Sequence, residues 1–100
     1  MIKSKKYRDG ARGQQCTMNI AGHCSYQEET VVFAHFPDES NGMGKKPDDI
    51  SGGDCCSACH DVVDGRVHSE EFRWHKHVYL RRSQTRTIKR RIEQGILKLA

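Results

Sequence analysis

The positions of the cysteines constrain what this chain can fold into more than any other feature. Two residues separate Cys56 from Cys59, and a second pair, Cys16 and Cys24, lies upstream. Zn²⁺ is held tetrahedrally by four thiolate or imidazole ligands, and Cys-x-x-Cys is a spacing at which two thiolates reach one ion. The sequence therefore predicts a structural zinc site formed by these four cysteines.

The fifth thiol and a nearby histidine leave alternatives for this site. Cys55 is the spare thiol, and we expect it to be a small buried side chain. His23 could take the place of Cys24, although thiolate binds zinc more strongly. Cys16 and Cys24 form a looser pair, with seven residues between them, so a hairpin is needed to bring them together.

Composition sets the size of the domain and its surroundings. One hundred residues are enough for one domain, but only 35% are hydrophobic and the mean hydropathy is −0.82. Such a chain buries little apolar surface, so a bound metal would contribute to its folding free energy. The basic N-terminus lacks the apolar stretch of a signal peptide, and no run is long enough to span a membrane. We expect a cytoplasmic protein, whose reduced thiols are metal ligands rather than disulfides.

Basic residues gather at both ends of the chain. Residues 1–13 carry five Lys or Arg against one Asp, residues 81–100 carry seven against one Glu, and the middle is acidic. Two basic ends suit a polyanion such as DNA, while a merely solvated helix face is the alternative. Two lysines lie beside glycines in the central loop. They could contact phosphates, because glycine lets the backbone approach closely, and the alternative is a flexible surface loop. The expected phosphate contacts are Lys45, Lys46, Arg86, Lys89 and Arg90.

Patterning predicts a single α+β domain over residues 14–100, preceded by a mobile or loosely packed basic arm over 1–13. Residues 14–37 contain strand material, clearest in the β-branched and aromatic run that ends at Pro37. The sequence predicts a polar loop over residues 38–54.

Two helices are predicted in the second half of the chain. The first covers 56–65, and the second begins after Ser69, a capping residue, and runs to about Gln94, with Gly95 as its stop. The expected buried stripe of the second helix is Phe72, Trp74 or His75, Val78, Tyr79, Ile88 and Ile92.

The order of strand, histidine-bearing strand, loop and Cys-x-x-Cys-His helix resembles the ββα-metal arrangement of His-Me finger nucleases. The chain is similar to the HNH and endonuclease VII group, and most similar to small YbcO-type prophage nucleases. The resemblance spans residues 11–64. It rests on Ala11-Arg12-Gly13, on Ile20-Ala21-Gly22 between Cys16 and Cys24, on Val32-Phe33-Ala34-His35, on the run from Gly42 to Asp49, and on Cys56-Ser57-Ala58-Cys59-His60-Asp61.

The resemblance implies a metal-dependent DNA endonuclease acting in phage or prophage DNA processing or recombination in a bacterial host cell. His35 would be the general base that activates water, and His60 the helix ligand of one catalytic ion, Mg²⁺ or Mn²⁺. The alternatives are a hydrogen-bonded strand histidine for His35, and a zinc ligand or helix-capping residue for His60. Because enzymes of the endonuclease VII type often act as dimers, a homodimer is a further expectation.

One position departs from the pattern of this group. Many HNH enzymes carry a metal-binding acid just before the catalytic histidine, and this chain has Ala34 there. Asp49 is the candidate second ligand, with Asp48 and the weaker His68 as alternatives. Either carboxylate could equally belong to the turn after Pro47. The departure leaves open a zinc-stabilised DNA-binding module without catalysis, and a zinc-dependent protein-interaction module is a further rival.

Overall fold

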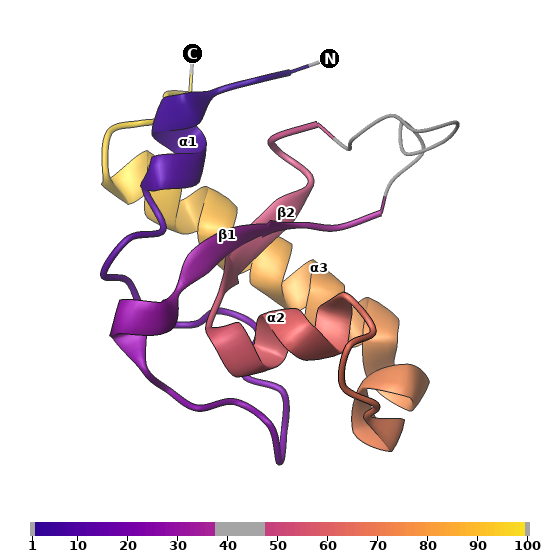
Figure 1. Cartoon of the computed structure of the whole chain (residues 1–100). Helices are drawn as coiled ribbons and strands as arrows, with labels where there is room; N and C mark the ends of the chain where they lie inside the picture. Colours follow the sequence, from indigo (N-terminus) through magenta and orange to yellow (C-terminus); the bar gives the residue numbers. More distant parts are fainter. Residues whose placement is uncertain (1, 38–47, 100) are drawn as a thin grey trace.

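The computed structural model describes residues 2–37 and 48–99. Figure 1 shows two crossing strands in the middle of the molecule, with α1 above them, α2 below them and the long helix α3 behind. The elements are α1 (Lys5–Asp9), a short 3₁₀ helix (Glu28–Thr30), β1 (Val32–His35), β2 (Gly52–Cys55), α2 (Ser57–Val63) and α3 (Glu70–Glu93). The small α+β domain with a C-terminal helix is thus confirmed.

The sheet consists of β1 and β2 paired antiparallel, with Val32 opposite Cys55 and His35 opposite Gly52. The sequence predicted β1, but β2 lies inside the segment predicted to be a polar loop. Its sequence, Gly-Gly-Asp-Cys, has no strand propensity. Tertiary packing explains the two glycines, because a Cβ on Gly53 would lie 2.0 Å from the Ser83 Oγ of α3. Only glycine lets α3 approach β2 this closely.

Helix α3 begins and ends where its capping residues predict. The Ser69 side chain accepts a hydrogen bond from the Phe72 amide (3.1 Å), and Gly95 follows the helix with φ of +75°. The predicted buried stripe is only partly right. Phe72 and Tyr79 are buried, but Trp74 and Val78 are 72% and 63% exposed.

Polar residues continue the buried face of α3, which is why an apolar stripe could not locate it. Ser83, Thr87 and Arg91 are fully buried, and Ile88 and Ile92 are only half-buried. The hydrogen-bond partners of Ser83 and Thr87 lie on β2 and in the segment before the sheet. Thr17 Oγ1 lies 2.6 Å from Ser83 Oγ, and the Asp54 amide donates to Thr87 Oγ1 (3.0 Å). The buried hydroxyls of Ser83 and Thr87 are therefore both hydrogen-bonded, as is usual for buried polar groups.

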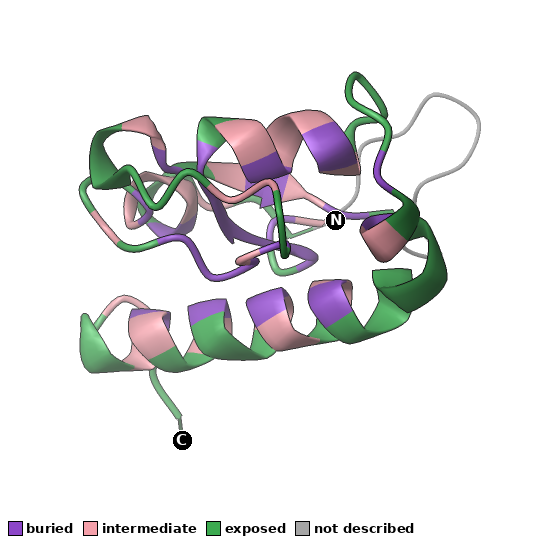
Figure 2. Cartoon of the chain, turned by 90° about the horizontal axis from the view of Figure 1, so that it is seen from below, coloured by how far each residue is buried: buried purple, intermediate pink, exposed green. Residues whose placement is uncertain are grey.

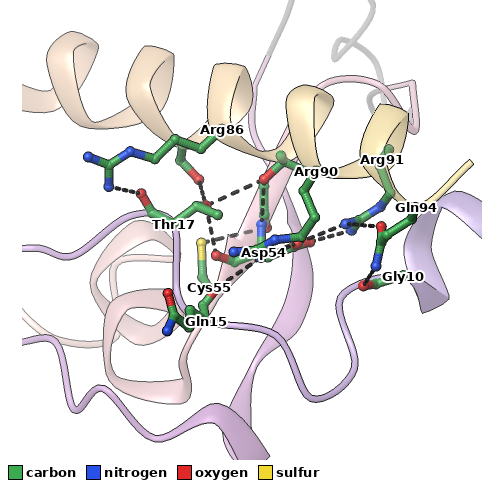
Figure 3. Close-up of polar contacts among 12 residues, drawn as sticks. Gly10, Gln15, Thr17, Asp54, Cys55, Arg86, Arg90, Arg91 and Gln94 are labelled. Carbon is green, nitrogen blue, oxygen red and sulfur yellow. Dashed lines mark hydrogen bonds and ion pairs between the residues drawn. The ribbon is translucent and has the colours of Figure 1, made fainter. Parts of the chain in front are cut away.

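A buried ion pair completes this interface. Asp54 and Arg91 are both fully buried and bonded to each other, and the Arg90 guanidinium also donates to Asp54 Oδ2 (2.8 Å) (Figure 3). Arg91 Nε donates to the Tyr7 carbonyl (2.6 Å), and the Gln94 amide donates to the Gly10 carbonyl (2.9 Å). These contacts tie the end of α3 both to the sheet and to the N-terminal segment.

The N-terminal segment packs more closely than the expected loosely attached arm. Tyr7 and Ala11 are buried in the core, and the Tyr7 ring contacts Phe33 edge-on with centroids 5.6 Å apart. The Arg91 guanidinium lies over the Tyr7 ring, 5.1 Å from its centroid. The basic side chains of α1 remain at the surface while its apolar residue turns inward. A boundary near residue 13 stays a prediction.

Figure 2 shows α3 as one layer and the remaining elements as a second layer above it, with the outer face of α3 exposed. The two layers enclose a core that includes Met18, Ile20, Val31, Phe36 and Val62. None of the helices among residues 2–37 and 48–99 combines the length and the apolar character that crossing a membrane requires.

Candidate functional site

The four predicted cysteines come together in the folded chain. The Sγ atoms of Cys16, Cys24, Cys56 and Cys59 all lie within 4.8 Å of one another, and none is in a disulfide. Tetrahedral zinc with Zn–S bonds of about 2.3 Å places its sulfurs about 3.8 Å apart. The Cys24 and Cys56 sulfurs are 3.8 Å apart. The cluster therefore has the donor set and the dimensions of a structural zinc site.

Local backbone geometry brings each half of the cluster into place. Cys56 is the N-cap of α2, and its Sγ accepts from the Cys59 amide (3.5 Å), so the Cys-x-x-Cys turn opens the helix. The segment from Cys16 to Cys24 closes by a tight turn without a strand hairpin. Its Asn19 and Gly22 have φ of +50° and +81°, and the amide of Cys24 donates to the Ile20 carbonyl (2.9 Å).

Two of the clustered sulfurs accept hydrogen bonds from neighbouring N–H groups. The Ile20 amide donates to Cys59 Sγ (3.4 Å) and the Asn19 side chain to Cys24 Sγ (3.5 Å). A hydrogen bond from the Cys59 thiol lowers the pKa of Cys16 to about 4, and the same bond raises the pKa of Cys59. Cys16 is thus the thiol of this pair that ionises more readily.

The remaining candidates for this centre lie outside it. Cys55 is fully buried, and burial raises the pKa of its thiol well above the ordinary value. Its Sγ–H donates towards the Gly53 carbonyl (3.6 Å). His23 is likewise not one of the four clustered residues.

A second arrangement of functional groups lies at the other end of β1. His35 Nε2 is 2.8 Å from Asp49 Oδ1, and the side chains are 30% and 6% exposed. Asp49 Oδ2 accepts from the Ser4 amide (2.6 Å) and from Arg8 Nη1 (2.5 Å). Burial would raise the pKa of Asp49, but these hydrogen bonds outweigh it and the pKa lies below its usual value.

The structure brings His35 and Asp49 together but gives His60 a different partner. His60 Nε2 lies 3.1 Å from Asp64 Oδ2, one turn further along α2. Among residues 2–37 and 48–99, the four cysteines are the only group of three or more Cys, His, Asp or Glu side chains whose ligand atoms come within 4.8 Å of one another. His35, His60 and Asp49 therefore do not form a compact three-ligand site.

The structure also shows the surroundings of Ala34 and His68, two further positions that bear on the predicted metal site. Ala34 is buried opposite Gly53, so the position before His35, where an acid ligand would be expected, faces the core. His68 lies at the surface, with its Nε2 2.7 Å from Glu70.

The predicted phosphate contacts are placed unequally. Arg86 and Lys89 are exposed on α3, where they line a hollow of about 470 Å³ together with Arg81 and Arg82. Arg86 also donates to Asn19 Oδ1 (3.0 Å). The Arg90 side chain is only 20% exposed and donates to Asp54 and to the Gln15 carbonyl (Figure 3). Lys45 and Lys46 lie outside the described residues.

Sequence reasoning did not identify Arg8, Asp64 or the Asp54–Arg91 pair. Arg8 contacts Asp49 across 41 positions, and Asp54 contacts Arg91 across 37. No local spacing signals such pairs. The His60–Asp64 pair could have been predicted from the sequence, because residues four apart on a helix lie on one face.

Comparison with known proteins gives consistent matches over nearly the whole chain. The sequence profile of the family described as "Putative nuclease YbcO" matches residues 5–96. Two curated relatives, "Putative nuclease YbcO" of Escherichia coli (strain K12) and "Putative nuclease ybcO" of Enterobacteria phage 82, are each 36% identical over 92 residues. Each alignment covers 91% of this chain and 95% of the relative.

A solved structure shows the same fold. It is described as "Structure of a putative bacteriophage protein from Escherichia coli str. K-12 substr. MG1655", and it is 33% identical in sequence. The TM-score is 0.72, with 90% of this chain and all of that chain covered. The arrangement of α1, the two strands, α2 and α3 is thus that of a known protein structure.

Proposed function

Because this chain belongs to the putative nuclease YbcO family, we propose that it is a metal-dependent DNA endonuclease that hydrolyses phosphodiester bonds. The observation that carries the proposal is the partly exposed His35 imidazole, held by the Asp49 carboxylate at the end of β1. A histidine fixed in this way and still open to solvent is suited to general base catalysis.

The hydrogen bond to Asp49 determines which nitrogen of His35 acts. An ionised carboxylate only accepts hydrogen bonds, so Nε2 carries the proton and Nδ1 keeps its lone pair. We propose that Nδ1 takes a proton from a water molecule, whose oxygen attacks the scissile phosphorus while the 3′-oxygen leaves. The imidazolium formed is stabilised by the adjacent carboxylate.

We propose His60 and Asp64 as the protein ligands of the catalytic Mg²⁺ or Mn²⁺ ion. His60 lies on α2 and Asp64 is the C-cap of that helix, with His60 Nε2 3.1 Å from Asp64 Oδ2. Asp64 Oδ2 also accepts from Arg66 Nη2 (2.7 Å), a contact that a bound ion would have to displace. Hard divalent ions prefer oxygen ligands and usually keep several waters, so two side chains, waters and a substrate phosphate form a plausible set. Bound there, the ion would stabilise charge on the phosphate and the leaving oxygen. Asp49 is left out, since both of its oxygens already accept hydrogen bonds.

The exposed basic face of α3 supports DNA as the substrate. Arg86 and Lys89 lie at the surface, and we propose that they contact the phosphate backbone without reading base sequence. Arg90 is better suited to holding Asp54 than to contacting DNA. The described relatives are named for a nuclease, one of them from a phage. We therefore propose a role in phage or prophage DNA processing in the bacterial cytoplasm, and a homodimer stays a prediction.

The arrangement also supports the HNH, or His-Me finger, assignment. A histidine ends β1, and an antiparallel strand leads into a helix that carries His60 after the Cys-x-x-Cys turn. The second candidate function is a zinc-stabilised DNA-binding module without catalysis. Ala34 favours it, because no acid precedes His35.

Plasmid nicking separates the two functions. Supercoiled plasmid is incubated with the protein and Mg²⁺ or Mn²⁺, and the wild type is compared with His35→Ala and His77→Ala. His77 is a matched control, since it is an exposed histidine on α3. We expect the wild type and His77→Ala to nick DNA and His35→Ala to lose at least about 100-fold in rate. Equal nicking by His35→Ala would contradict the assigned base, and DNA binding without nicking would favour the binding module.

A further inference from the structure

We propose that Asp49 is the positioning residue of His35, and that Arg8 and the Ser4 amide hold its carboxylate in place. The proposal rests on the proposed function, in which His35 is the general base. It gives the basic N-terminal segment a specific task, since two of its residues complete a chain of contacts that ends at the imidazole.

The two oxygens of Asp49 have separate tasks. Oδ1 lies 2.8 Å from His35 Nε2, while Oδ2 accepts hydrogen bonds from the Ser4 amide (2.6 Å) and from Arg8 Nη1 (2.5 Å). Asp49 itself is almost completely buried. A carboxylate held by two donors on one oxygen cannot rotate freely, so the direction of its other oxygen is set.

Backbone contacts hold the segment that carries Asp49. The Asp49 amide donates to the Ile2 carbonyl (2.9 Å), and the Ile2 amide donates to the Asp48 side chain (3.0 Å). Ser4 is also the N-cap of α1, where its hydroxyl accepts from the Tyr7 amide (3.1 Å). The start of α1 and the Asp48–Asp49 segment therefore form one hydrogen-bonded unit.

Aromatic packing also restrains the imidazole. The rings of Phe33 and His35 meet edge-on, with centroids 5.2 Å apart and an interplanar angle of 87°. Tyr7 in turn packs edge-on against Phe33. With one ring nitrogen on Asp49 and its ring against Phe33, His35 presents its other nitrogen, Nδ1, in a fixed direction.

The same geometry distinguishes positioning from metal binding. A metal ligand needs a free oxygen lone pair pointing towards the ion, and both Asp49 oxygens point at protein donors. Removal of the Asp49 charge should therefore change the behaviour of His35 and leave the metal requirement unchanged.

The test combines nitrogen NMR of His35 with single-turnover nicking in the full chain. Asp49→Asn removes the charge at nearly constant shape, and Asp9→Asn is the matched control, because Asp9 is an exposed carboxylate in α1. We expect wild-type His35 to be protonated at Nε2 when neutral, and Asp49→Asn to show a mixture of tautomers. Its nicking rate at saturating DNA should fall about 10- to 100-fold with unchanged DNA affinity, and Asp9→Asn should match the wild type.

A second pair of variants keeps the proposal testable if Asp49→Asn does not fold. Arg8→Gln removes one anchor of the carboxylate but leaves the His35 contact, so a smaller shift of the tautomer signals and a smaller loss of rate are expected. Asp49→Glu keeps the charge and should retain the Nε2-protonated form expected for the wild type.

Two outcomes would overturn the proposal. One is an unchanged His35 tautomer in Asp49→Asn. The other is a nicking defect in Asp49→Asn that higher Mg²⁺ or Mn²⁺ restores, because that result identifies a metal ligand. If the wild type does not nick DNA at all, the proposed function fails, whereas the NMR comparison still decides whether Asp49 orients His35.

Discussion

Asp54 on β2 and Arg91 on α3 form an ion pair in which both side chains are completely buried. Three elements depend on it, because Arg91 also donates to the Tyr7 carbonyl of α1. A charge in such surroundings is tolerated only while its partner is present.

Loss of either partner should therefore be strongly destabilising. We expect Arg91→Met or Asp54→Asn to lower the free energy of unfolding by about 3–5 kcal/mol in urea titrations, since each leaves an unpaired buried charge. The exposed Lys5–Asp9 pair is the control, and Lys5→Ala should cost less than about 1 kcal/mol. Similar losses for Lys5→Ala and Arg91→Met would contradict a special role for the buried pair.

The four-cysteine cluster predicts about one zinc ion per chain. Cys24→Ser should lose this zinc and much of the thermal stability, because it removes one of four ligands. Cys55→Ala should keep the zinc, since Cys55 lies outside the cluster. Elemental analysis of each variant, purified without a histidine tag, measures its zinc content. Zinc loss in Cys55→Ala with retention in Cys24→Ser would reverse the assignment.

Zinc binding should release fewer than four protons at pH 7. The Cys59 hydrogen bond lowers the pKa of Cys16 to about 4, so this thiol is already ionised in the metal-free protein. Calorimetry in buffers of different ionisation enthalpy counts the protons. Release of four would show that the thiols titrate independently before zinc binds, without the Cys16–Cys59 hydrogen bond.

Asp49 should stabilise the fold fully above about pH 4 and lose this contribution as the pH falls through its lowered folded-state pKa. Its pKa in the folded protein lies below the ordinary value of about 4, so the folded state binds fewer protons than the unfolded state in this range. The contribution is complete at neutral pH and is lost as the pH falls through the folded-state pKa. The free energies of unfolding of wild type and Asp49→Asn should differ at pH 6 and converge as the pH falls through the folded-state pKa of Asp49. A constant difference across this range would argue against the ionised contact.

DNA binding should depend on Arg86 and Lys89 more than on Arg90. Alanine at either exposed position should weaken binding to any sequence and reduce the slope of log K against log salt by about 1. Thr85→Ala, on the same helix face, is the uncharged control. Arg90→Ala should instead lower stability, because its guanidinium is bonded to Asp54. Fluorescence anisotropy at several salt concentrations separates these cases.

Local signals account for the parts of the protein that its sequence predicted. Cys56 and Cys59 lie within one turn, and the Cys-x-x-Cys spacing alone indicates a shared ion. The ends of α3 follow from Ser69 and Gly95, since capping depends on residues within the first and last turns. The position of His35 at the end of a β-branched strand was equally visible.

The tertiary structure alone decided the contacts between distant segments. The Gly-Gly-Asp-Cys strand is selected by the close approach of Ser83, and Asp49 acquires its partners His35 and Arg8 across 14 and 41 positions. Side-chain periodicity reports only neighbours on one element, and hydrogen-bonded polar residues buried on α3 carry no apolar pattern. The sequence by itself thus determined which four cysteines cluster and that the chain belongs to the putative nuclease YbcO family, whereas folding determined which carboxylate holds the histidine.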